Sequence, residues 1–386
     1  MNTIAIKPEL LKWARERAGL LPSDISKDKR FTKYELWESG KKMPTFKQLE
    51  GFAHKTYTPF GYFFLPKPPP EDKIPIPDFR TIKNKCIQRP SLHLLDTIQT
   101  MQSRQEWMRD FFISEREEKL PFIGSAKGCN DPIKIAADIR GALNKTPGWA
   151  ERHWSYEEAL RTLRNAIDDL GIMIVSNGVV GNSTNRALDP EEFRGFVLVD
   201  EYAPLIFING NDTKSARMFT IAHELAHLWL GESGVFNFEK TMPAENKVER
   251  LCNMIAAEFL VPKAELNALW GQIKSDEDRF NKIAKKFKVS SLVAARRAFD
   301  LSFISESQFY SYYEHDVAQY IDLKKKRKPG GNAILSQNTR VGKLFGLTVG
   351  RAVREGKLLY RDAYQLTGLN GNIFEKFISG LEMNLV

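Results

Sequence analysis

The stretch RMFTIAHELAHLWLG, from Arg217 to Gly231, is almost entirely apolar or small, yet it contains two histidines and a glutamate. Asp212 or Thr213 precedes it as a helix-capping side chain, no proline interrupts it, and Gly231 stands where helices commonly end. We therefore predict a helix in the protein core. Two imidazoles and a carboxylate buried without partners would cost on the order of several kcal/mol, so this helix should hold a ligand.

The spacing of the polar residues indicates which ligand. His223 and His227 are four residues apart and project from one face of the helix, which suits two nitrogen ligands of one zinc ion. Glu224 lies one step round the helix and reaches a water on the metal more readily than the metal itself. This is the His-Glu-x-x-His motif of metallopeptidases. A chance match is the alternative, but it would usually fall on a loop or an exposed face.

A third metal ligand should follow on another helix. The segment Ala244–Val261 has helical apolar spacing, and Pro262 ends it. Glu249 at the edge of the apolar stripe can complete a His-His-Glu site, and Asn253 one turn later can bond a ligand histidine from outside. Glu245 is the competing ligand, and either glutamate could instead be a solvated charge. The apolar positions are Val248, Leu251, Cys252, Ile255, Ala256 and Phe259.

The composition limits the class of protein. With 386 residues the chain is long enough for two or three domains, and it has neither a membrane-length apolar run nor a signal-peptide pattern, so we expect a cytoplasmic protein without membrane contact. Its net charge of +9 comes from residues 1–80 and 301–386, which places any nucleic-acid contact at the ends. The three scattered cysteines suggest reduced thiols: Cys86, Cys129 and Cys252.

The first 66 residues are predicted to form a helical module. Trp37–Gly40 (WESG) and Pro44–Ala53 resemble the closing half of the XRE-type, phage-repressor-like helix-turn-helix, in which the helix ending in this motif enters the major groove. The turn glycine of that family is absent and the segment before Trp37 is about two residues short. DNA binding and a structural or partner-docking remnant therefore stay open. The candidate phosphate contacts are Lys27, Lys29, Arg30 and Lys33.

The rest of the chain suggests three further segments: a proline-rich linker at 67–80, a metallopeptidase domain at 81–300 with its core at about 150–275, and a helical subdomain at 301–386. Helices are expected at 91–119, 132–144, 155–170 and 275–300. Three short apolar runs before the motif helix should be strands, and an edge strand could pair with a peptide substrate. These runs are Ile172–Val175, Phe193–Asp200 and Pro204–Ile208; a loop is expected at 232–243.

Two matched segments resemble the ImmA/IrrE metallo-endopeptidases: Phe219–His227 (FTIAHELAH) and Glu249–Pro262 (ERLCNMIAAEFLVP). In the second segment Cys252 replaces the family's alanine and Ile255 its phenylalanine, both conservative for packing. The resemblance implies an α+β, mostly helical fold with a zincin-like (gluzincin-like) core. It also favours Glu249 over Glu245 as third ligand. It implies a Zn²⁺ enzyme, with Mn²⁺ as an alternative metal, that cleaves a transcriptional repressor or antitoxin encoded nearby.

Within that resemblance Glu224 would act as general base toward the attacking water and pass its proton to the leaving amine. Candidate oxyanion donors are His153, Tyr156 and Tyr202. The alternative function is a DNA-binding regulator or an antitoxin of a toxin–antitoxin pair with little or no peptidase activity. A purely structural zinc site would normally need four protein ligands, and the sequence offers three.

Overall fold

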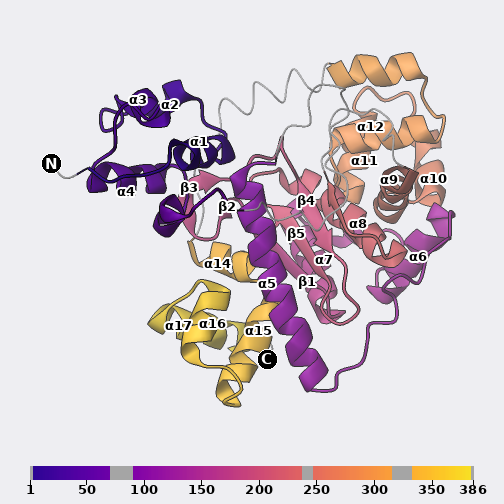
Figure 1. Ribbon diagram of the computed structural model, residues 1–386. Coiled ribbons are helices and arrows are strands. Elements are labelled where there is room, and N and C mark those ends of the chain that lie inside the picture. The colour runs from indigo at the N-terminus through magenta and orange to yellow at the C-terminus, as the bar shows by residue number, and fades with distance from the viewer. Residues whose placement is uncertain (1–2, 70–89, 237–246, 315–332, 384–386) are drawn as a thin grey trace. The chain divides into compact units, whose positions relative to one another are not determined.

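The computed structural model describes residues 3–69, 90–236, 247–314 and 333–383 (Figure 1). Over these residues the chain is mostly helical with two small sheets, which confirms the expected mostly helical α+β class. It divides into two compact units, Met1–Pro75 with Ile87–Asp96, and Ile76–Cys86 with Thr97–Val386. None of the described helices is both long and apolar enough to cross a bilayer.

The first unit is a small helical bundle. Its elements are α1 (Pro8–Arg17), α2 (Pro22–Ser26), α3 (Tyr34–Glu38), α4 (Phe46–Lys55) and the 3₁₀ helix η1 (Phe60–Phe64). Trp37 is buried in an aromatic core with Phe31, Tyr34 and Phe52. The Arg15 guanidinium lies 2.7 Å from the Glu38 carboxylate and ties α1 to α3.

The second unit is built around a four-stranded sheet in the order β1 (Met173–Asn177), β5 (Leu205–Asn209), β4 (Gly195–Leu198) and β6 (Gly234–Phe236). The pair β1–β5 is parallel, and the pairs β4–β5 and β4–β6 are antiparallel. Every residue of β1, β4 and β5 is buried, so helices and loops cover both faces of these strands. A strand overlaps each of the three predicted runs, and β1 and β5 extend one or two residues beyond the predicted ends.

Two elements of the sheets were not expected from the sequence. Strand β6 lies inside the stretch 232–243, which was predicted to be only a loop, and it pairs with β4 in the register Gly195↔Phe236. That prediction is wrong at 234–236, and residues 237–243 lie outside the described part of the chain. A three-residue strand leaves too short a pattern to be read from sequence. The hairpin of β2 (Val179–Val180) and β3 (Ser183–Ala187) was also missed.

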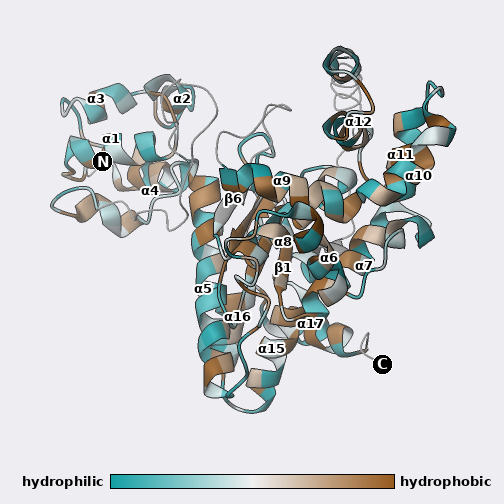
Figure 2. Ribbon diagram, turned by 90° about the vertical axis from the view of Figure 1, so that its right-hand side faces the viewer, coloured by the Kyte–Doolittle hydropathy of each residue, from teal (hydrophilic) through white to brown (hydrophobic). Residues whose placement is uncertain are grey.

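The helices that position the candidate site pack against this sheet and against each other. Helix α7 (Tyr156–Asp169) contacts β1, and α8 (Lys214–Leu230) contacts β4 and β5. Helix α9 (Lys247–Leu260) packs on α8 and on α6 (Pro132–Ala142). In Figure 2 the outer helix α5 alternates teal and brown, and every residue of α8 from Met218 to Leu230 is buried. The motif helix therefore lies in the interior, as predicted.

Further helices in the described part of the chain are η2 (Trp149–Arg152), α5 (Leu92–Ser114), α10 (Lys263–Ile273), α11 (Arg279–Phe287), α12 (Ser291–Asp300), α14 (Ala333–Val341), α15 (Lys343–Arg354), α16 (Tyr360–Thr367) and α17 (Gly371–Met383). Residues 306–314 are also helical. The sequence reading missed α10. Gly342, with φ of 89°, separates α14 from α15. Residues 70–80 of the predicted proline-rich linker lie outside the described residues.

Candidate metal centre

Helix α8 forms because its ends are well capped and its body is apolar. The Thr213 hydroxyl accepts a hydrogen bond from the backbone N–H of Ala216, and Gly231 closes the helix in the left-handed conformation at φ 74°. Of the two predicted caps, Thr213 therefore does the capping. All residues from Met218 to Leu230 are buried, and this places the motif inside the fold.

Three predicted ligand side chains converge on one point. The Nε2 atoms of His223 and His227 are 3.1 Å apart. The Glu249 carboxylate, presented by α9, places Oε2 3.1 Å from Nε2 of His223 and Oε1 3.2 Å from Nε2 of His227. Both imidazoles are buried, whereas Glu249 is partly exposed, so the open side of the cluster lies toward α9.

Asn253 and burial set the protonation state of His223. Its Nδ1 lies 3.0 Å from Oδ1 of Asn253, and because an amide oxygen only accepts, Nδ1 carries the hydrogen. Burial lowers the pKa of His223 against the opposing effect of Glu249, so the ring is neutral near pH 7. Nε2 therefore presents its lone pair to the Glu249 carboxylate, and Asn253 occupies the outer position predicted for it.

The donor set fits a divalent ion. Burial pushes the pKa of Glu249 up, but its close contacts with the His223 and His227 rings hold it below its ordinary range. A carboxylate thus faces an imidazole lone pair, an arrangement that a cation would stabilise. Two ligands held at roughly 2.0–2.1 Å by a tetrahedral zinc ion lie about 3.3 Å apart. The observed separations of 3.1–3.2 Å are close to this value.

Cys252 is a second nearby donor. Its Sγ lies within 4.8 Å of the ligand nitrogens of His223 and His227. Burial, with the charge of Glu249 next, raises the pKa of this thiol well above its usual range, so it is held protonated. The ionised oxygens of Glu249 lie 3.1 and 3.2 Å from these nitrogens, which favours Glu249 over Cys252 as the proposed third ligand. The competing Glu245 lies outside the described residues.

Glu224 is fully buried between α8 and β4. Neither carboxylate oxygen has a hydrogen-bond partner among the described residues. Burial, and then the charge of Glu249, raises the pKa of Glu224 well above its ordinary range. Burying a carboxylic acid without hydrogen-bond partners destabilises a protein. A buried acid of this kind is therefore a candidate for a functional residue rather than for a residue that stabilises the fold.

Gly195 on β4 makes room for this carboxylate. A Cβ built at Gly195 would lie 2.6 Å from Cγ2 of Thr220 and 3.3 Å from Oε1 of Glu224. Any larger residue here would push α8 away from the sheet. The sequence reading did not single out Gly195, although an isolated glycine in a strand pattern signals a close backbone approach.

The three candidate oxyanion donors have other contacts. The Tyr156 hydroxyl donates to the backbone carbonyls of Ala284 and Val289 at 3.0 and 3.1 Å, so it closes the end of α11. His153 lies 3.7 Å from Glu158 and packs against Trp149. Tyr202 contacts Lys119 through its ring. None of these described contacts involves the histidine–glutamate cluster.

The four predicted DNA-contacting cations are exposed around the connection from α2 to α3. Lys27 pairs with Asp24 at 2.9 Å, and Arg30 pairs with Asp28 at 2.7 Å. These pairs reduce the positive charge of the surface. Helix α3, which carries the WESG resemblance, has five residues.

Comparison with known families agrees with this geometry. Residues 167–299 match the peptidase family described as the IrrE N-terminal-like domain (Peptidase_M78). The matched region contains the motif helix and α9, and it supports a metallopeptidase of the ImmA/IrrE type, which implies a metal ion. Residues 341–379 match a domain of unknown function (DUF8813). No curated protein matches the chain.

Proposed function

We propose that the chain is a zinc-dependent endopeptidase that cleaves a cognate protein. The observation that carries the proposal is the convergence of two imidazole nitrogens and one carboxylate within 3.2 Å beside an unpartnered buried acid. His223, His227 and Glu249 would hold the metal ion, and Asn253 would orient His223. The match over residues 167–299 supports the same class of reaction.

Glu224 is the proposed catalytic residue. When bound, the metal ion supplies Lewis-acid chemistry to the site. Glu224 accepts a proton from the attacking water and delivers it to the nitrogen of the departing amine. Its burial excludes bulk water from the carboxylate, and Gly195 leaves the space in which the carboxylate lies. Asn253 keeps the hydrogen of His223 on Nδ1 so that Nε2 remains a ligand.

The four-stranded sheet offers a way to align a peptide. Strand β6 forms its outer edge beside β4 and also contacts α8. An extended substrate segment can add to such an edge through backbone hydrogen bonds. The substrate class follows from the family resemblance: a transcriptional repressor or an antitoxin, encoded by a neighbouring gene and cut to relieve repression.

Incubation of the purified chain with the product of the neighbouring gene tests this function. We expect two discrete fragments with metal present, and intact protein after a chelator removes the metal. Restoration of cleavage by added Zn²⁺ or Mn²⁺ would identify the metals that work. Cleavage that persists at full rate in chelator would contradict a metal-dependent enzyme.

The alternative is a DNA-binding regulator or antitoxin with little peptidase activity. The exposure of Lys27, Lys29, Arg30 and Lys33 favours it, whereas the two local acid pairs and the short α3 weigh against it. A gel-shift titration against duplex DNA at several salt concentrations distinguishes the two. DNA binding through these cations would weaken steeply with salt, and it would be lost on changing all four to alanine.

A further inference from the structure

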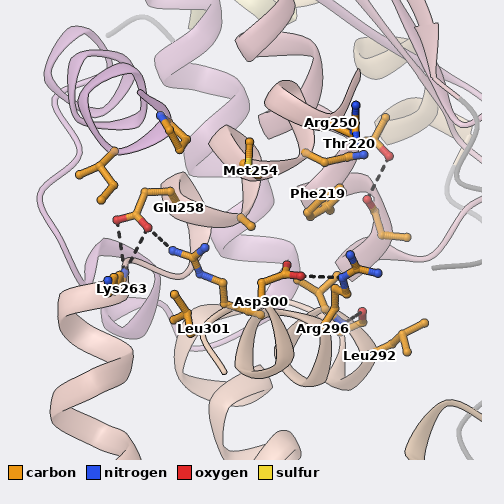
Figure 3. Close-up of a pocket in the computed structure, with 18 of the residues that line it drawn as sticks. Phe219, Thr220, Arg250, Met254, Glu258, Lys263, Leu292, Arg296, Asp300 and Leu301 are labelled. Carbon is orange, nitrogen blue, oxygen red and sulfur yellow. Dashed lines mark hydrogen bonds and ion pairs between the residues drawn. The ribbon is translucent and has the colours of Figure 1, made fainter. Parts of the chain in front are cut away.

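A cavity of about 510 Å³ lies beside the proposed metal centre and is lined by residues of α8 and α9 (Figure 3). Thr220 and Asn253 line it, and both also border the centre, since Asn253 bonds His223 and Thr220 lies against Gly195. From there the cavity extends toward α12 and the start of α10. A peptide held at the centre would therefore have this cavity within reach of one of its side chains.

Much of the cavity lining is apolar. Figure 3 shows Phe219 and Met254 on the α8–α9 side and Leu292 and Leu301 on the α12 side. Met254 is 47% exposed, and Ile133 at the start of α6, which also lines the cavity, is 51% exposed. Large apolar side chains left open around a concave site are typical of a ligand pocket.

The charges around this apolar lining are unbalanced. Five basic residues and two acidic residues line the cavity: Arg194, Arg250, Lys263, Arg296, Arg297, Glu258 and Asp300. Both acids are already paired, Glu258 with Arg297 and Asp300 with Arg296. Arg194 pairs with Asp212 at 3.2 Å. The side chains of Arg250 and Lys263 have no acidic partner among the residues that the structure describes.

We propose that this cavity is the specificity pocket of the peptidase and that it takes a large apolar side chain flanked by acidic residues. This inference rests on the proposed peptidase function, because it names the class of peptide that the proposed active site would cleave. Arg250 on α9 lines the cavity and is exposed, so it attracts one carboxylate of the bound segment. Lys263, which is labelled in Figure 3, lines another part of the cavity and attracts a second carboxylate.

Peptide binding tests the pocket separately from cleavage. Three fluorescein-labelled decapeptides are needed, with the central sequences Glu-Leu-Phe-Glu, Lys-Leu-Phe-Lys and Glu-Ser-Ser-Glu. Their affinities for the full chain carrying Glu224→Gln and loaded with zinc are measured by fluorescence anisotropy. We expect the acidic–apolar peptide to bind about tenfold more tightly than either of the others. The serine peptide controls for carboxylates that simply bind the metal.

Two substitutions at the cavity should move this preference. Arg250→Glu should weaken binding of the acidic–apolar peptide about tenfold and strengthen binding of the basic one, whereas Lys285→Glu, an exposed cation of α11, should change neither. Met254→Ser should weaken both apolar peptides, whereas Ile113→Ser, an equally exposed apolar residue of α5, should not. All four side chains are exposed, so the melting temperatures should stay close to that of the parent.

The outcomes separate the pocket from the enzyme. Equal affinities for the three peptides, no binding by any of them, or an Arg250→Glu effect no larger than that of Lys285→Glu would overturn the pocket. Selective binding by a chain that cleaves nothing in the wild-type form would leave the pocket standing and remove the proposed peptidase function. Cleavage of the neighbouring protein without selective peptide binding would do the reverse.

Discussion

Glu224 and Glu258 are buried carboxylates on two helices that pack together, and they differ in what surrounds their oxygens. Glu258 receives the Arg297 guanidinium and the backbone N–H of Lys263 at 3.2 and 3.3 Å. Glu224 receives no hydrogen bond from any described residue. The fold has therefore neutralised one buried acid completely and left the other available.

The difference separates a structural acid, Glu258, from the proposed catalytic acid, Glu224. Glu258 joins the end of α9 to the start of α10 and to α12, and each of its contacts stabilises the packing of these helices. Glu224 stabilises nothing that the described structure shows, and burial raises its pKa well above the ordinary range. A buried acid that destabilises the fold and makes no stabilising contact is best explained by a role in the proposed reaction.

Substitution of the functional acid should give the largest effect. Glu224→Gln keeps the shape of the side chain but removes proton transfer, so we expect the cleavage rate to fall by about a thousandfold. Metal content and melting temperature should stay at the wild-type values or rise. Cleavage of the neighbouring-gene protein, followed on gels alongside thermal unfolding, measures both. Cleavage at the wild-type rate would show that Glu224 is not the base.

Substitution of the structural acid should give the opposite pattern. Glu258→Ala leaves the Arg297 charge buried without its partner, and the free energy of unfolding should fall by about 3–5 kcal/mol. Urea unfolding measures this loss. The control is Glu151→Ala, which breaks the more exposed pair with Lys286 and should cost less than about 1 kcal/mol. Similar losses for the two variants would mean that Glu258 is not the structural acid described here.

Asp168 near the end of α7 provides a third buried acid for the comparison. Its Oδ1 accepts a hydrogen bond from the N–H of Leu344, yet burial raises its pKa from 3.8 to about 7. Because the folded-state pKa is the higher one, the stability that this group contributes is fully present below about pH 4 and is lost as the pH rises through about 7, by about 4 kcal/mol. Asp168→Asn should remove this fall.

Urea unfolding at several pH values between 4 and 8 checks the prediction for Asp168. The matched control is Asp169→Asn, which changes the exposed neighbour that pairs with Lys343 and should leave the pH dependence of the wild type intact. A wild-type chain whose unfolding free energy stays constant over this range would contradict the assignment of a raised pKa to Asp168.

The smallest of these effects should come from the residue behind the ligands. Asn253→Ala removes the hydrogen bond that orients His223, and we expect zinc affinity to fall by about 10–100-fold. Competition with a chromophoric chelator measures it. Asn253→Asp retains an acceptor oxygen at this position and should recover most of the affinity. Equal losses in both variants would indicate a packing role for Asn253 instead.

The convergence of the proposed ligands could be predicted from the sequence because most of the relevant information is local. His223, Glu224 and His227 lie within one turn and a half of a single helix, and helical periodicity alone places Glu249 and Asn253 on the next one. His223 and His227 then meet Glu249 as soon as the second helix packs on the first.

The rest of the site depends on contacts between distant segments and could not be predicted. Gly195 is important because α8 approaches β4 closely at this position, and the sequence around Gly195 gives no indication that Glu224 lies beside it. The cavity combines residues of α8 and α9 with residues of α12, more than thirty positions further on. Strand β6 forms because β4 offers it an edge. Such features arise from tertiary packing, for which a single sequence has no periodic signal.

Metal analysis of the purified full chain tests the central claim most directly. The account predicts about one zinc or manganese ion per chain, retained by Glu224→Gln and lost in the double variant His223→Ala/His227→Ala. A wild-type chain with less than about half an ion, after it has been dialysed against an excess of zinc, would contradict the proposed centre. So would a double variant that keeps its metal.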